Sequence, residues 1–441
     1  MMSNELMDLA AWTIKEARGA GADQARVRIS SNRAVEVGYR ERKPETIKEA
    51  STRNLGVEIF AGGRYSSQTT SDLRRNAMRA FIANAVASTK LLAEDPFRTL
   101  PDAKFYEGRE DRDLGLFDPG HGAFRPEDRH ALVKAAEAAA LAEGGKDVIS
   151  VSAQSRDSAA ESVMISSNGF QGARKSTSYS LMASMTLQDA GDRRPNGWAY
   201  AVTADRKSLP SPKTIGREAA KNTRLLLGAK KLKTETLPVI IVNRMAGWML
   251  NGFLQPLYGR NIDQKQSFLL DKLGKTVGSR HFTLIDDPFI QGGLGSRTFD
   301  GDGLTAKKMV LVENGVLRNY YIDWYYSRKL GWEPTTGSPS NLIIPPGSRS
   351  VSDIMKDLGR GILLTGFIGG NSNPTTGDTS IGISGRLFED GVPVQSVAEM
   401  NIADNHLKFW ERLIEVADDP WIYSSMRMPS LVVDKVVVAG V

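Results

Sequence analysis

The chain has 441 residues, of which 41% are hydrophobic and 24% are charged. This composition is typical of a soluble protein that is long enough for two or three domains and buries its own core. There is no cysteine, which excludes disulfides, thiolate zinc sites, iron–sulfur clusters and cysteine nucleophiles. We therefore expect a reducing, cytoplasmic environment.

The net charge of +6 raises the question of nucleic-acid binding. The densest basic runs, residues 40–43 and 230–233, are short and are not interleaved with aromatic residues. We expect solvated basic faces and no nucleic-acid partner. The first residues lack the layout of a signal peptide, and no run approaches the roughly 18 apolar residues that span a bilayer, so no membrane contact is expected either.

The N-terminal half shows the same order of elements twice. Apolar residues at helical spacing predict helices, and alternating runs between Gly-rich turns predict short strands. The expected helices are residues 4–19, 72–92, 129–143 and 212–227. The expected strands are residues 25–30, 34–39, 47–60, 148–152, 162–166, 177–187 and 198–203, with turns at Asn168-Gly169 and Asn196-Gly197. We predict two helix–sheet units, about 1–104 and 126–228, within an N-terminal α+β domain of residues 1–232.

A polar run near residue 232 precedes the buried-looking sequence PVIIV, which indicates that a second domain, 233–441, begins there. That half is rich in β-type runs and Gly-rich turns. The clearest runs are residues 309–312, 361–365, 381–388 and 431–438. One helix is expected at 397–416. The fold class is therefore α+β, with a C-terminal half that forms a large, mostly antiparallel β domain with few helices.

Several motifs of the C-terminal half resemble one known family. The most distinctive are SFLLDKLGK at residues 267–275, GSRTFDGDG at 295–303 and TTGDTSIGISG at 375–385. In this order they resemble the TldD/PmbA family, peptidases of the U62 type that are also described as modulators of DNA gyrase. The closest likeness is to its metal-free TldE/PmbA-like subunit. The resemblance implies two related proteins that assemble as one hydrolase, in which the TldD-type member holds zinc through an H-E-x-x-x-H helix and a later cysteine.

The zinc ligands have no counterparts here. The H-E-x-x-x-H positions correspond to residues 250–255, where Leu250, Asn251 and Gln255 replace the two histidines and the glutamate. A hydrolytic zinc needs three protein ligands and a carboxylate base, so we expect no catalytic residue and no metal in this chain, and zinc in a TldD-like partner. The four histidines are not at ligand spacing. They are His121, His130, His281 and His406.

Other candidate sites are weaker. The DGDG sequence at residues 300–303 reads as a turn, with a cation site as the alternative. No G-x-S-x-G nucleophile elbow and no phosphate-binding Gly-Lys-Ser/Thr loop is present. The aromatic run at residues 320–326 suits either a peptide groove or subunit interface, or a packed hairpin end.

These inferences favour an accessory subunit that completes the cavity of a zinc peptidase and holds an extended peptide through an exposed strand edge. By position, the cleft residues are Trp248, Asn251, Gln255, Asp302 and Asp378. The expected partners are a TldD-like zinc-bearing subunit and an unfolded peptide, and the isolated chain could form a homodimer. The alternatives are a regulator that binds gyrase directly, or an autonomous homo-oligomeric hydrolase.

Overall fold

The computed structural model describes residues 2–441, with side chains from residue 4 onward. Helices and long strands alternate in its N-terminal half. The helices are α1 (Met2–Gly19), α2 (Arg75–Thr89), α3 (Pro126–Gly144) and α4 (Pro212–Arg224). The strands are β1 (Gln24–Arg40), β2 (Lys43–Ala61), β3 (Arg64–Thr70), β4 (Val148–Ser166), β5 (Gln171–Leu187) and β6 (Asn196–Thr203).

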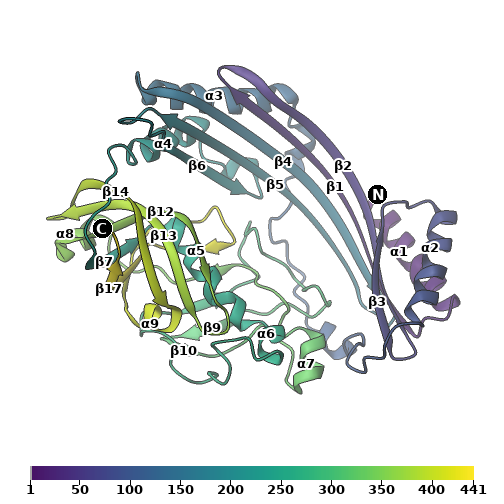
Figure 1. Cartoon of the computed structure of the whole chain (residues 1–441). Coiled ribbons are helices and arrows are strands. Elements are labelled where there is room, and N and C mark those ends of the chain that lie inside the picture. The colour runs from purple at the N-terminus through teal and green to yellow at the C-terminus, as the bar shows by residue number, and fades with distance from the viewer. Residues whose placement is uncertain (1) are drawn as a thin grey trace.

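These strands form a single antiparallel sheet in the order β3-β2-β1-β4-β5-β6. The first strands of the two predicted units, β1 and β4, pair from Arg26–Ser166 to Arg40–Ser152. The two helix–sheet units are therefore halves of one sheet. Figure 1 shows this sheet as a long, curved arch over the C-terminal half of the chain.

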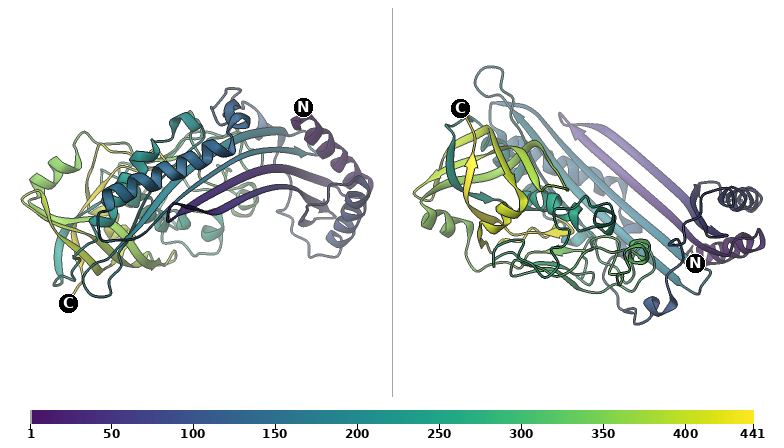
Figure 2. Two further views of the ribbon diagram at one scale, coloured as in Figure 1. Left: turned by 90° about the horizontal axis from the view of Figure 1, so that it is seen from above. Right: turned by 60° about the horizontal axis from the view of Figure 1, so that its bottom comes forward.

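The helices cover the arch in two pairs, and each pair shares a core with the strands beneath it. Residues of α1 and α2, including Ala10 and Ile82, are buried with Val27 of β1. Residues of α3 and α4, including Val133 and Ile215, are buried with strands at the other end of the sheet. Figure 2 shows the two pairs at opposite ends of the arch, with the C-terminal half beneath α3 and α4.

The C-terminal half is built on two further sheets. The larger has the order β14-β13-β12-β7-β17-β15 and the smaller β10-β9-β8-β11-β16. Most neighbours are antiparallel, while β7–β12 and β11–β16 are parallel, so the predicted α+β class is confirmed. The strands of the larger sheet are β7 (Glu235–Ile241), β12 (Arg360–Ser372), β13 (Asp378–Glu389), β14 (Val392–Asn405), β15 (Leu413–Val416) and β17 (Leu431–Val438).

Short elements complete this half. The strands of the smaller sheet are β8 (Leu284–Asp286), β9 (Met309–Glu313), β10 (Val316–Leu317), β11 (Leu342–Ile343) and β16 (Met426–Arg427). The helices are α5 (Asn243–Leu254), α6 (Gly259–Asp263), α7 (Trp324–Leu330), α8 (Val351–Leu358) and α9 (His406–Glu411). No helix in the described part of the chain is long and apolar enough to cross a membrane.

The helix expected at residues 397–416 is wrong. Its first part is the end of β14, and only α9 is helical. The cause is a β-bulge: Ile383 pairs with Met400 but Gly385 pairs with Val397, so β14 carries one extra residue, and Glu399 has a φ of 57°. The bulge turns both Val397 and Met400 into the core. Their spacing of three then imitates one face of a helix.

The turn expected at Asn196-Gly197 is also wrong, because both residues lie in β6 and the chain reverses before them. Gly197 is needed for packing, not for a turn. A Cβ atom there would lie 2.5 Å from the backbone nitrogen of Thr223, so only glycine lets α4 approach β6 this closely.

Candidate functional site

Helix α5 directly follows the central strand β7 and has two different faces. Met245, Met249, Leu250 and Phe253 recur at helical spacing and are buried in the main core of the C-terminal half. Trp248 is 37% exposed on the other face, where Asn251 is also exposed. The sequence pattern therefore fixes which side of α5 can meet a ligand.

The residues of α5 at the zinc-ligand positions expected from the resemblance do not have the chemistry of zinc ligands. Leu250 is fully buried in the core, while Asn251 and Gln255 are exposed. An alkyl side chain cannot coordinate a metal, and carboxamides are poor ligands for zinc. Within residues 2–441, no group of three or more His, Cys, Asp or Glu side chains is arranged to hold a metal ion.

His406 packs against α5 at Gly252, which lies between Asn251 and Gln255. A Cβ atom on Gly252 would lie 2.3 Å from its Nε2 atom, so glycine is required for this close approach. Burial lowers the pKa of His406 to about 4, and Asp404 opposes the shift. The Nε2 atom is 3.1 Å from the Ser372 hydroxyl.

The hydrogen bonds around Ser372 argue against its activation by His406. The Thr379 hydroxyl donates to the carbonyl of Asn371, and Ser372 lies 3.0 Å from Thr379 Oγ1. If Nε2 carries the proton, His406 donates to Ser372 and Ser372 donates to Thr379, and the unpartnered Nδ1 is then an acceptor and not a buried N–H group. In this arrangement the imidazole N–H donates a hydrogen bond to the serine hydroxyl, so the imidazole is not placed to accept the proton of that hydroxyl.

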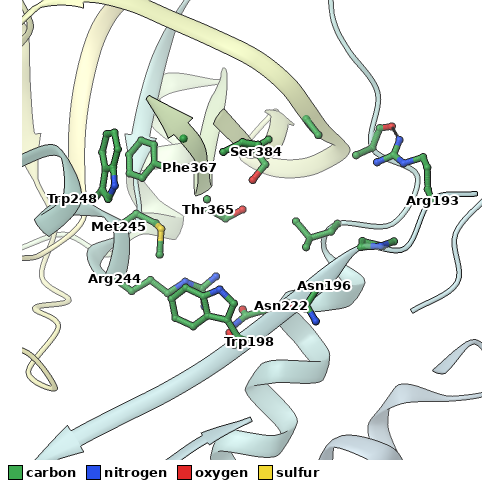
Figure 3. A pocket seen from close by; sticks show the side chains of 18 residues that line it. Arg193, Asn196, Trp198, Asn222, Arg244, Met245, Trp248, Thr365, Phe367 and Ser384 are labelled. Atoms are coloured by element: carbon green, nitrogen blue, oxygen red, sulfur yellow. Dashed lines mark hydrogen bonds between the residues drawn. The ribbon is translucent and has the colours of Figure 1, made fainter. Parts of the chain in front are cut away.

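The other face of α5 borders a cavity of about 580 Å³. It lies where the two halves of the chain meet, since β6 and α4 contribute one side and α5 and β12 the other. The rings of Trp248 and Phe367 stack with centroids 4.3 Å apart. Figure 3 shows this stacked pair on one side of the cavity and Trp198 with Arg244 on another.

Arg244 is the unusual residue of this cavity. Burial lowers the pKa of its guanidinium, and the charge of Glu218 partly opposes the shift. Glu218 nevertheless forms no ion pair with it, and the guanidinium of Arg244 has no hydrogen bond or salt bridge to any other described residue. Arg193, the other cation at the cavity, is already engaged by Asp189 at 3.7 Å and by the carbonyl of Ala229.

The backbone of β12 also borders the cavity. β13 pairs along one edge of β12, whereas β7 pairs with the other edge only at Ile362–Leu364. Past Leu364 this edge has no neighbouring strand among the described residues, and it is here that residues 365–369 line the cavity. An edge of this kind can accept a further extended chain.

The structure does not bring the predicted cleft residues into one cavity, and Asn251 lines neither of the two cavities near α5. Trp248 lines the 580 Å³ cavity, and Gln255 lines a different one of about 350 Å³ next to Tyr258 and Tyr326. Asp378 lines neither, because it closes a tight turn at the start of β13. The Thr376 hydroxyl and the Asn405 amide donate to its carboxylate and lower its pKa.

Asp302 is engaged inside the molecule. Its carboxylate accepts from Arg26 Nη1 at 2.9 Å, and Glu58 contacts the same atom at 3.3 Å. Arg26 is 4% exposed, so this buried ion pair joins β1 of the arch to the C-terminal half. The neighbouring Asp300 accepts the backbone N–H groups of Asp302 and Leu304, which supports the reading of DGDG as a turn.

The aromatic run at residues 320–326 is packed, but not as a hairpin end. Tyr320 and Tyr321 are buried in the core, and α7 begins at Trp324. Trp324 Nε1 donates to Thr99 and the Tyr325 hydroxyl donates to Asp95, at 3.0 and 2.8 Å. These rings therefore join the connection after α2 to the C-terminal half.

Comparison with known proteins agrees with this architecture. Three family models match in order: PmbA/TldA metallopeptidase domain 1 over residues 25–89, the central domain over 122–227 and the C-terminal domain over 234–440. They cover most of the chain, which therefore belongs to the PmbA/TldD metallopeptidase family.

Relatives span nearly the whole chain. A metalloprotease PmbA homolog of Haemophilus influenzae is 29% identical, and metalloprotease PmbA of Escherichia coli O157:H7 is 26% identical, each over 99% of this chain and 96% of its own length. A Bacteroides thetaiotaomicron structure, described as a candidate modulator of DNA gyrase, has a TM-score of 0.97 and 33% identity over all of both chains. TldE from Thermococcus kodakarensis is 19% identical with a TM-score of 0.86, over 98% of this chain and all of its own, which shows a common fold.

Proposed function

We propose that this chain is a metal-free, peptide-binding subunit that works with a zinc-bearing TldD-like relative in one peptidase. The observation that carries the proposal is the composition of α5. Leu250 occupies a zinc-ligand position of the family and is fully buried in the core, and neither Asn251 nor Gln255 can complete a site. The metal and the general base of a peptidase would come from the partner.

The cavity beside α5 supports the peptide-binding part of the proposal. It combines apolar walls, an unpaired guanidinium and an unpaired strand edge along residues 365–369. Main-chain pairing with such an edge accepts many sequences, as a subunit that handles unfolded peptides in the cytoplasm would need.

Co-expression with the TldD-like protein of the same genome tests the proposal. We expect a stable complex whose zinc content resides in the partner, with hydrolysis of unfolded peptides by the complex and none by this chain alone. The partner should lose activity when its own H-E-x-x-x-H glutamate is changed to glutamine. Mixing this chain with that variant should give no activity.

Two outcomes would replace the proposal. Zinc bound to the isolated chain, together with peptide hydrolysis, would establish an autonomous hydrolase. Direct binding to DNA gyrase without any peptidase partner would favour the regulator, the role in the description of the Bacteroides structure. Sedimentation of the isolated chain determines whether it forms a homodimer.

A further inference from the structure

The charged side chains that line the 580 Å³ cavity are all positive. Its lining, as far as the chain is described, contains two arginines and no aspartate or glutamate. Arg193 is held by Asp189 and Ala229, which leaves Arg244 as the free cation. The guanidinium of Arg244 is partly removed from water and its N–H groups are not taken by a described residue, so an anionic ligand would find these donors available.

The polar groups near Arg244 leave further hydrogen-bonding capacity. The hydroxyls of Thr365 and Ser384 line the cavity and bond to no other side chain or backbone group of the described residues. Asn222 donates its amide N–H to the carbonyl of Trp198, and the amide oxygen then remains as an acceptor. A ligand with a carboxylate and a neighbouring N–H group would find complementary partners here.

The apolar walls indicate what adjoins the carboxylate. Trp198 comes from β6, and the stacked rings of Trp248 and Phe367 come from α5 and β12. Flat rings of this kind bind an aromatic or branched side chain with little loss of conformational entropy. The volume falls within the range of about 300–1,000 Å³ that is usual for small-ligand pockets.

We propose that this cavity binds the C-terminal residue of an extended peptide, with its carboxylate on Arg244, its apolar side chain against Trp198 and Trp248, and its backbone along the free edge of β12. Arginine suits this role because its planar guanidinium can engage both carboxylate oxygens. The choice of a peptide over other carboxylates rests on the proposed function and on the strand edge. The choice of a carboxylate rests on the cavity itself.

Binding to the isolated chain tests the inference without a peptidase partner. The probe is the peptide acetyl-Ala-Ala-Phe with a free carboxylate, and its amide is the matched control, both measured by isothermal titration calorimetry. We expect at least tenfold weaker binding of the amide. Acetyl-Phe separates a small carboxylate from a peptide end, since it lacks the backbone that pairs with β12. The amidated peptide acetyl-Ala-Glu-Phe tests whether an acidic side chain can replace the terminus.

Two arginine variants locate the site. Arg244→Gln should weaken binding of the acid at least tenfold and leave the amide unchanged, whereas Arg244→Lys should retain part of the preference. Arg217→Gln is the control, because this arginine lies on α4, is exposed and, among the described residues, forms an ion pair only with Glu143, at 3.6 Å. Thermal unfolding of each variant separates lost binding from lost folding.

The inference is overturned if acid and amide bind equally, if neither binds, or if the folded Arg244→Gln variant binds the acid as the parent does. Binding of acetyl-Phe as tight as that of the tripeptide would replace the peptide with a small carboxylate. Failure to find a zinc-bearing partner would reject the proposed function and leave a measured preference for the carboxylate intact.

Discussion

The burial of His406 as a neutral imidazole should make the folded chain less stable as the pH falls, and this can be measured without knowing any ligand. The imidazole is 1% exposed, and its ring is stacked 5.8 Å from that of Phe268. Burial opposes its charged form and lowers the pKa from the ordinary 6.5 to about 4.

The sign follows from proton linkage. Between pH 6.5 and 4 the unfolded chain binds a proton at this histidine and the folded chain does not, so the free energy of unfolding falls as the pH falls through this range. A difference of about two and a half pH units, at about 1.4 kcal/mol for each unit, corresponds to about 3 kcal/mol. The loss is complete below pH 4.

Urea unfolding followed by tryptophan fluorescence, repeated from pH 7 to 4, measures this loss. His406→Gln removes the titrating group, so the parent should lose about 3 kcal/mol more than this variant across the range. Titration of the carboxylates common to both proteins cancels in the comparison. Ser372→Ala removes the hydrogen-bonding partner but keeps the buried imidazole, and should retain the pH dependence of the parent. A parent-minus-variant difference that stays constant from pH 6.5 to 4 would refute the reasoning.

Two further substitutions test the packing of the arch. Gly197→Ala should lower the free energy of unfolding by about 1–3 kcal/mol, because the methyl group forces α4 away from β6. The control is Gly19→Ala, which should leave the melting temperature almost unchanged because no atom lies near the added methyl group. Asp302→Ala should cost about 3 kcal/mol, because the buried charge of Arg26 keeps only one carboxylate partner, the more distant Glu58. Glu49→Ala breaks a half-exposed pair and should have a much smaller effect, so equal losses in these two variants would contradict the burial argument.

The local sequence pattern was sufficient to predict most helices and strands. It was insufficient where segments that are distant in the sequence pair with one another. The predicted helix at residues 129–143 lies within α3 because its alanine-rich sequence favours helix by itself. The error at 397–416 arose because the spacing of Val397 and Met400 depends on a bulge against β13, which no local pattern reveals. The single sheet was likewise hidden, since the pairing of β1 with β4 joins residues more than a hundred positions apart.

The residues of the candidate site were also only partly predictable from the sequence. Position within the family motif led to Trp248, which does line the cavity, and also to Asp302, which is engaged in a buried ion pair. Arg244 was missed, although a lone charge within the apolar sequence NRMAGWMLNGFL was a usable signal. Trp198 could not have been found, because it reaches the cavity from the other half of the chain.

The pairing of β1 with β4 has a consequence for anyone dissecting the protein. A fragment that ends before residue 126 would expose the whole edge of β1 from Arg26 to Arg40, with its amide and carbonyl groups unpaired. Such an edge is a template for self-assembly, so the first unit should aggregate when it is produced alone, whereas a fragment that extends through β6 keeps every strand of the sheet.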